Sequence, residues 1–168
     1  VFMNAGAYDG CCADVLESVR CLMPSGFAEE IPVAELEMGY RTSRVRTEGL
    51  VVLSATFTLE PGDAAAIFAR VDELTQARES KQPLELPSAG STFKRPEGHF
   101  AGKLITDAGL KGYQVGGAAV SKKHAGFVVN VGGATAADVR AVISHVQDEV
   151  KRQFDVALEP EVRFVGEF

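Results

Sequence analysis

The stretch GFVVNVGGATAADVRAVISHVQDEVKRQF (residues 126–154) predicts a strand followed by a long helix. Thr135 suits the N-cap of that helix, because its hydroxyl can accept a main-chain N–H of the first turn. Apolar side chains recur at helical spacing and form one stripe, made of Val139, Val142, Ile143, Val146 and Val150. We expect this helix to pack on a small sheet, which makes this half of the chain α+β.

The flanking sequence predicts shorter elements. The pattern indicates a helix at residues 101–108 and strands at residues 113–121 and 162–165. In the first half it indicates a helical turn at residues 33–38 and strands at residues 14–23 and 50–59, the latter rich in β-branched side chains. Asp63 suits the N-cap of a further helix that reaches about Ser80, with an apolar stripe of Ile67, Val71 and Leu74.

The segment 81–98 is expected to be a long ordered loop between two modules, because prolines and glycines punctuate its polar sequence. We therefore divide the chain into residues 1–82 and residues 83–168. The chain begins without methionine in a loop of small residues, so we expect the natural protein to start well upstream.

Composition excludes several classes of protein. The 168 residues are 46% hydrophobic and 24% charged, which is typical of a globular protein with a real core. A net charge of −6 argues against general binding to nucleic acid or anionic membranes, so an anionic ligand needs a local basic pocket. We see neither a membrane-spanning run nor a signal peptide, and expect a cytoplasmic protein. The cysteines, Cys11, Cys12 and Cys21, fit reduced thiols, and we expect no metal.

Two motifs could serve proton transfer or anion binding. Ser91 stands beside Gly90 and three residues before the cations Lys94 and Arg95, so this loop could present a proton donor next to an anion site. A surface turn with solvated cations explains the same residues, and spacing alone favours it. The second motif, Gly116–Ala125, joins two glycines with Lys122, Lys123 and His124, and could hold a pyrophosphate. A strand followed by a solvated basic turn explains it equally well.

Two further residues could act on a carboxylate or an enol oxygen. Arg41, between Tyr40 and Thr42, could polarise such a group, although an ordinary surface ion pair is the simpler interpretation. Glu161 precedes the last expected strand, where a half-buried carboxylic acid could transfer a proton. The alternative is an ion pair of Glu159 or Glu161 with Arg163.

The order and identity of seven motifs resemble the UDP-N-acetylenolpyruvoylglucosamine reductase family. These motifs are Asn4–Tyr8, Tyr40–Ser43, Gln82–Glu85, Ser88–Pro96, Gly109–Gly112, Gly116–Ala118 and Glu159–Val162. The resemblance covers the whole chain. It implies the C-terminal part of a flavoenzyme, with a partial flavin-binding α+β module before a small α/β sandwich that binds the UDP-sugar.

Members of this family use FAD and NADPH to reduce the enolpyruvyl group of UDP-N-acetylglucosamine enolpyruvate, giving UDP-N-acetylmuramate for peptidoglycan. The resemblance implies that Ser91 donates a proton to the enol carbon, and that Arg41 and Glu161 stabilise or protonate the enolate. It implies substrate contacts for Lys94, Lys111 and His124. The flavin contacts that it implies are Asn4, Ala5, Gly6 and Ala7.

The chain also departs from the family pattern. Asp9 stands where glycine is usual, Cys11 where glutamate is common, Arg95 where many members carry asparagine, and Val45 where an aromatic is frequent. The glycine- and serine-rich flavin-binding segment is missing, and so is the tyrosine-bearing loop of one branch, which indicates the shorter branch.

Three hypotheses follow. The chain is part of the reductase and is inactive alone, or it is a cofactor-free module that binds a UDP-sugar, or it is a structural fragment that self-associates through an exposed sheet edge.

Overall fold

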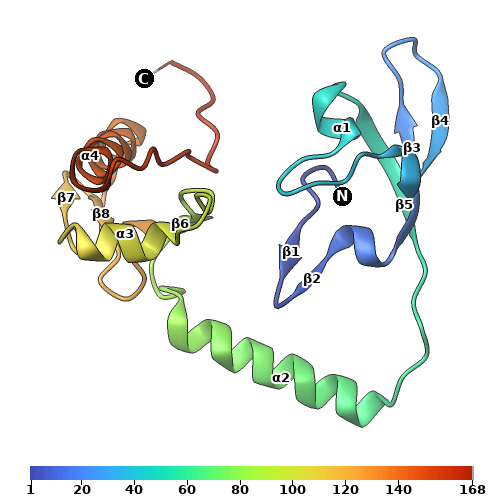
Figure 1. Ribbon diagram of the computed structural model, residues 1–168, viewed down its shortest axis with the longest axis horizontal. Coiled ribbons are helices and arrows are strands. Elements are labelled where there is room, and N and C mark those ends of the chain that lie inside the picture. Colours follow the sequence, from blue (N-terminus) through green and yellow to red (C-terminus); the bar gives the residue numbers. More distant parts are fainter. Residues whose placement is uncertain (168) are drawn as a thin grey trace. The chain divides into compact units, whose positions relative to one another are not determined.

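The computed structural model describes residues 1–167, and the chain folds into two compact units, Val1–Ala64 and Ala65–Phe168 (Figure 1). The paired strands are antiparallel, and the chain combines these sheets with helices, which confirms the α+β prediction. The assignment of residues 1–82 to cofactor binding and 83–168 to substrate binding stays a prediction. No helix in residues 1–167 is long and apolar enough to cross a membrane.

The first unit is built on a three-stranded sheet. Its order is β4 (Ala28–Pro32), β3 (Leu16–Leu22) and β5 (Val51–Phe57), so the predicted strands at 14–23 and 50–59 are confirmed. The predicted turn at 33–38 forms as η2 (Val33–Glu35), and α1 (Arg44–Thr47) precedes β5. The core contains Leu16, Val19, Cys21, Ile31, Leu36, Val45 and Leu50. Burial raises the pKa of the Cys21 thiol, which keeps it protonated.

A tight hairpin lies near the start of the first unit. Strands β1 (Gly6–Ala7) and β2 (Gly10–Cys11) pair across a turn of two residues, and η1 (Cys12–Asp14) follows. Both turn residues, Tyr8 (φ 51°) and Asp9 (φ 69°), adopt the left-handed conformation that such turns require. Glycine adopts this conformation most readily, and aspartate is among the other residues that tolerate it, as Asp9 does here.

The helix predicted from Asp63 to about Ser80 forms as α2 (Ala64–Lys81). Its predicted stripe is not buried: Ile67 is 50% exposed and Val71 is 52% exposed, and within the described residues no α2 side chain is buried. Periodicity identifies an amphipathic helix, but it does not supply the surface against which the helix packs.

The second unit has a four-stranded sheet with two helices on one face (Figure 1). The sheet order is β6 (Ser88–Ser91), β9 (Phe127–Asn130), β8 (Ala118–Val120) and β7 (Gln114–Val115). Helices α3 (Ala101–Asp107) and α4 (Ala136–Phe154) confirm the predicted positions. The predicted stripe of α4 enters the core through Val142, Ile143, Val146 and Val150, and Val139 packs against it.

Three predicted elements of the second unit are wrong. The loop at 81–98 contains β6, which the sequence hides because serine, alanine and glycine carry no strand signal. The single strand at 113–121 is a hairpin of β7 and β8 that turns at Gly116–Gly117. Residues 162–165 form no strand. The pairing in this part of the chain lies at Pro160, which forms an isolated bridge with Phe93.

Candidate functional site

The first group of candidate residues surrounds a pocket in the first unit. The pocket has a volume of about 480 Å³ and is lined by Asn4, Gly6, Ala7, Tyr8, Asp9, Gly10, Cys11, Gly39, Tyr40 and Arg41. The predicted flavin contacts and Arg41 therefore meet around one cavity. Ala5 does not line it, and its carbonyl instead accepts the Cys12 N–H at 2.8 Å.

Arg41 occupies the second corner of a tight turn at this pocket. Gly39 and Thr42 close the turn with two main-chain hydrogen bonds of 3.1 and 3.3 Å. Arg41 has a φ of 56°, which is uncommon for a residue other than glycine and persists only where neighbours hold it. The Arg46 guanidinium supplies one such contact, donating to the Arg41 carbonyl at 2.8 Å. The turn therefore fixes the backbone from which the Arg41 guanidinium extends.

Asn4 connects the hairpin loop to the Arg41 turn. Its side-chain oxygen accepts the Ala13 N–H at 3.0 Å, and its amide nitrogen donates to the Gly39 carbonyl at 3.3 Å. The residue is only 9% exposed. The structure thus gives Asn4 a role in shaping the pocket, and its predicted contact with a flavin stays a prediction.

Cys11, which lines the pocket, bonds to a carboxylate of its own unit. The Asp14 side chain accepts the Cys11 N–H at 2.6 Å and the Cys11 thiol at 3.3 Å. These hydrogen bonds, the main-chain one first, lower the pKa of Asp14 below its usual value. A negative charge on Asp14 therefore lies next to Cys11, which lines the pocket.

The second group lies at the β6 edge of the sheet in the second unit, around Ser91. Ser88 pairs with Val129, whereas Ser91 pairs with Phe127, so β6 has one extra residue between these pairs. This is a β-bulge, and Gly90 adopts its left-handed conformation with a φ of 84°. Because paired residues project to the same face, the bulge places Ser91 on the face of Phe127 and Val129, opposite α4. Within residues 1–167 the exposed Ser91 hydroxyl has no hydrogen-bond partner.

The segment that carries Glu161 pairs with the chain that directly follows Ser91. The Glu161 N–H donates to the Thr92 carbonyl at 2.8 Å, and the Lys94 N–H donates to the Glu159 carbonyl at 2.9 Å. Lys94 and Glu159 also form an ion pair in which the Lys94 side chain is 22% exposed. The structure thus pairs the segment of Ser91 and Lys94 with the segment of Glu161, and it gives Glu159 an ion pair with Lys94. The alternative ion pair of Glu159 or Glu161 with Arg163 stays a prediction.

Lys111 and His124 lie outside the paired segments that carry Ser91, Lys94 and Glu161. Lys111 is exposed between α3 and β7, and the Lys122 side chain passes over the neighbouring Gly112. The His124 Nδ1 atom accepts the Gly126 N–H at 3.1 Å, and its ring meets the edge of Phe127 at 5.0 Å between centroids. His124 therefore closes the turn before β9, and its predicted substrate contact stays a prediction.

The two glycines of the β7–β8 turn approach the protein's own chain. A Cβ atom on Gly117 would lie 2.3 Å from the Gly132 carbonyl oxygen and from the Ala134 nitrogen, and one on Gly116 would lie 2.5 Å from the Asp138 side chain. Asp138 belongs to the capping box of α4, and the Thr135 N–H bond lowers its pKa. The glycines at positions 116 and 117 are therefore explained by their packing against the protein's own chain, without a bound pyrophosphate.

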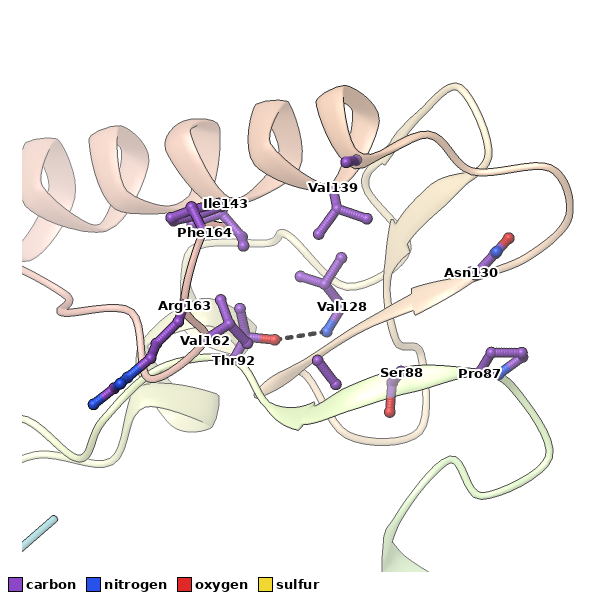
Figure 2. Close-up of a pocket in the computed structure, with 12 residues that line it drawn as sticks. Pro87, Ser88, Thr92, Val128, Asn130, Val139, Ile143, Val162, Arg163 and Phe164 are labelled. Atoms are coloured by element: carbon purple, nitrogen blue, oxygen red, sulfur yellow. Dashed lines mark hydrogen bonds between the residues drawn. The ribbon is translucent and has the colours of Figure 1, made fainter. Parts of the chain in front are cut away.

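A separate apolar pocket of about 440 Å³ lies between β6, β9 and α4, bordered by Val162–Phe164 (Figure 2). Figure 2 shows the Ser88 hydroxyl turned away from α4, as the register requires, and the Thr92 side chain turned toward Val128. Neither Ser91 nor Glu161 lines this pocket, and among the residues that the structure describes Arg163 is its one ionisable lining residue. It therefore offers no acid–base group to the chemistry.

No sequence pattern indicates a role for Thr92. Thr92 nevertheless forms hydrogen bonds to β9 and to the Glu161 segment. The feature of the sequence that points to the bulge is Gly90, between Ser88 and Ser91, because a glycine inside a strand indicates a bulge. No sequence pattern shows that the segment around Glu161 pairs with the residues after the bulge.

Comparison with known proteins decides the family. A family profile described as the C-terminal domain of UDP-N-acetylenolpyruvoylglucosamine reductase matches residues 82–165, which is half of the chain. The chain belongs to the UDP-N-acetylenolpyruvoylglucosamine reductase family. The resemblance read from the seven motifs is thereby confirmed, and the matched range of this family includes Ser91, Lys94, Lys111, His124 and Glu161.

Individual members of the UDP-N-acetylenolpyruvoylglucosamine reductase family are similar over nearly the whole chain. A reductase of that name from Clostridium perfringens is 60% identical over 166 residues, and one from Clostridium beijerinckii is 62% identical over 167 residues. Each match covers 99% of this chain but 55% of the relative. The chain thus spans about half the length of the curated relatives it matches.

A crystal structure of the reductase from Thermus caldophilus shares the fold, with a TM-score of 0.82 and 35% sequence identity. That match covers 96% of this chain and 57% of the Thermus chain. It therefore extends over both units of this chain.

Proposed function

We propose that the protein containing this chain reduces UDP-N-acetylglucosamine enolpyruvate to UDP-N-acetylmuramate in peptidoglycan biosynthesis. The observation that carries the proposal is the pairing of the Ser91 and Glu161 segments within a family of that name. A hydroxyl on one of these segments and a carboxyl group on the other are the two kinds of group that a proton transfer needs. The chain alone, spanning about half of its relatives, is expected to be inactive.

The pocket of the first unit fits part of an FAD molecule. Its volume of about 480 Å³ lies within the range of small-molecule sites, and Gly6, Ala7, Gly10 and Gly39 leave main-chain atoms accessible in its wall. Asn4 shapes the loop and Arg41 supplies a cation at its rim. When bound, FAD accepts hydride equivalents from NADPH and supplies them to the enolpyruvyl double bond.

The chain's own residues handle the charge and the proton. As the enolpyruvyl group gains electrons, negative charge grows toward its carboxylate, and the Arg41 guanidinium is suited to stabilise that charge. The Ser91 Oγ–H then donates the proton to the enol carbon. Glu161, which is half-buried, stabilises or protonates the enolate oxygen.

Lys94 is proposed to bind an oxygen of the substrate, and its ion pair with Glu159 allows a test. Lys94→Met is expected to raise the KM for the UDP-sugar about tenfold or more, because a charged hydrogen bond is lost. Glu159→Gln removes the ion pair but keeps the Lys94 charge, so KM is expected to stay level or to fall. Steady-state kinetics on the complete protein measure both. Equal increases in KM would show that Lys94 serves only to hold Glu159.

Two observations support the other hypotheses in part. The second unit has its own core, as a separate UDP-sugar module requires. Strand β5 is an edge strand of its sheet within residues 1–167, and Val51 and Leu53 on it are 56% and 52% exposed, as self-association requires. Self-association, and the cytoplasmic location expected from the sequence, stay predictions.

The deciding experiment follows flavin absorbance in the complete protein without oxygen. NADPH is expected to bleach the flavin, and UDP-N-acetylglucosamine enolpyruvate is expected to restore the oxidised spectrum with UDP-N-acetylmuramate as product. A flavin that stays bleached after the UDP-sugar is added would refute the proposed function. A protein without flavin that still binds the UDP-sugar in calorimetry would favour the binding-module hypothesis.

A further inference from the structure

Thr92 lies where the chain passes from the β6 bulge to the Glu161 segment, and it is only 2% exposed. Its main-chain N–H donates to the Gly126 carbonyl at 2.8 Å, and its carbonyl accepts the Glu161 N–H at 2.8 Å. Its hydroxyl oxygen accepts the Val128 N–H at 2.9 Å (Figure 2). One buried residue thus makes three hydrogen bonds, which join β6, β9 and the Glu161 segment.

The bond to Val128 compensates for the bulge. The extra residue of β6 lies between its pairs with Val129 and Phe127, so the main-chain ladder is interrupted opposite Val128. Val128 is 7% exposed, and a buried N–H without a partner costs about 1–3 kcal/mol. The Thr92 hydroxyl takes the place of the missing main-chain acceptor.

The bulge has a functional consequence because it reverses the face of Ser91. In a regular strand, residues three apart project to opposite faces, yet Ser88 and Ser91 project to the same face here. Without the bulge, Ser91 would point toward α4 and the core. Whatever stabilises the bulge therefore also places the Ser91 hydroxyl on the exposed face.

We propose that Thr92 is a positioning residue for Ser91 and Glu161: its hydroxyl holds the bulge that places Ser91, and its carbonyl holds Glu161 beside it. This rests on the function proposed above for Ser91 and Glu161. The requirement is for a β-hydroxyl at position 92. Valine has the same shape but no acceptor, and serine keeps the acceptor but loses a methyl group.

The test separates the two half-reactions of the complete protein. Thr92→Val is expected to slow the reoxidation of reduced flavin by the UDP-sugar about ten- to hundredfold, because a misplacement of about 1 Å has an effect of that size. Bleaching of the flavin by NADPH is expected to keep its wild-type rate. Thr92→Ser is expected to restore most of the reoxidation rate.

A second readout does not depend on turnover. In amide hydrogen exchange, the Val128 N–H is expected to exchange faster in Thr92→Val than in the wild type, and at nearly the wild-type rate in Thr92→Ser. If Thr92→Val fails to fold, Thr92→Ala is measured with the same expectations. Thr106→Val is the matched control: its hydroxyl bonds the Gly102 carbonyl on the exposed side of α3, so both readouts are expected to stay unchanged.

Wild-type reoxidation kinetics in a folded Thr92→Val variant would overturn the proposal, and so would failure of Thr92→Ser to restore the rate. If the wild-type protein itself shows no flavin turnover, the proposed function fails and the catalytic role of Thr92 fails with it. Faster exchange at Val128 would then still identify the hydroxyl as the support of the bulge.

Discussion

Ser91→Ala is expected to slow the reoxidation of reduced flavin by UDP-N-acetylglucosamine enolpyruvate by about 10²–10⁴-fold, the usual contribution of a positioned general acid. The reason is that within residues 1–167 the Ser91 hydroxyl has no hydrogen-bond partner of its own, and that its segment pairs with the segment of Glu161. Stopped-flow absorbance of the complete protein measures the rate. Flavin reduction by NADPH and the melting temperature are expected to stay near wild type, because an exposed hydroxyl contributes little to the core.

Two further variants make the Ser91 prediction sharper. Ser91→Cys keeps an ionisable proton at the same place and is expected to retain more activity than Ser91→Ala. Ser144→Ala, on an exposed position of α4, applies the same change away from the site and is expected to leave both half-reactions unchanged. A Ser91→Ala protein that reoxidises at the wild-type rate would remove Ser91 as the proton donor.

Gly117→Ala is expected to be the most destabilising of the changes considered, by about 3 kcal/mol or more. The added Cβ would lie 2.3 Å from two main-chain atoms of the loop before α4, so that loop or the β7–β8 turn must move. A loss of this size lowers the melting temperature by about ten degrees or more in a unit of this length. Thermal unfolding followed by circular dichroism measures it.

Gly102→Ala is the matched control for Gly117→Ala. In α3 the added Cβ would find its nearest neighbours at 3.4 Å, and alanine favours a helix over glycine by about 1 kcal/mol. We therefore expect Gly102→Ala to be neutral or slightly stabilising. Similar melting temperatures for Gly117→Ala and the wild type would show that the turn and the loop are not packed as the structure has them.

Helix α4 could be predicted from sequence because three local signals agree. The Thr135 cap, the apolar stripe and the length of the segment all indicate the same element, and the stripe fills the core. The exposed stripe of α2 shows the limit of such signals. A helical period identifies the apolar face of the helix, but its burial depends on a partner surface that local sequence does not encode.

The candidate site could be predicted in its residues but not in its arrangement. The resemblance supplied Ser91, Arg41 and Glu161, yet nothing local indicates that Glu161 pairs with Thr92. The bulge was missed because Ser88–Ser91 contains no β-branched or aromatic residue. The close approach of Gly116 and Gly117 was recognised from composition, but the atoms that they approach belong to a loop distant in sequence.

The pairing of the Ser91 and Glu161 segments also affects how the protein is made. Lys94 and Glu159, which join the same two segments, are separated by 65 residues of chain. The ribosome adds about 5–20 residues per second, so Ser91 leaves the ribosome several seconds before Glu161 is added. A nascent chain can therefore form the β7–β8 hairpin early, but it cannot pair the Ser91 and Glu161 segments until α4 has been synthesised.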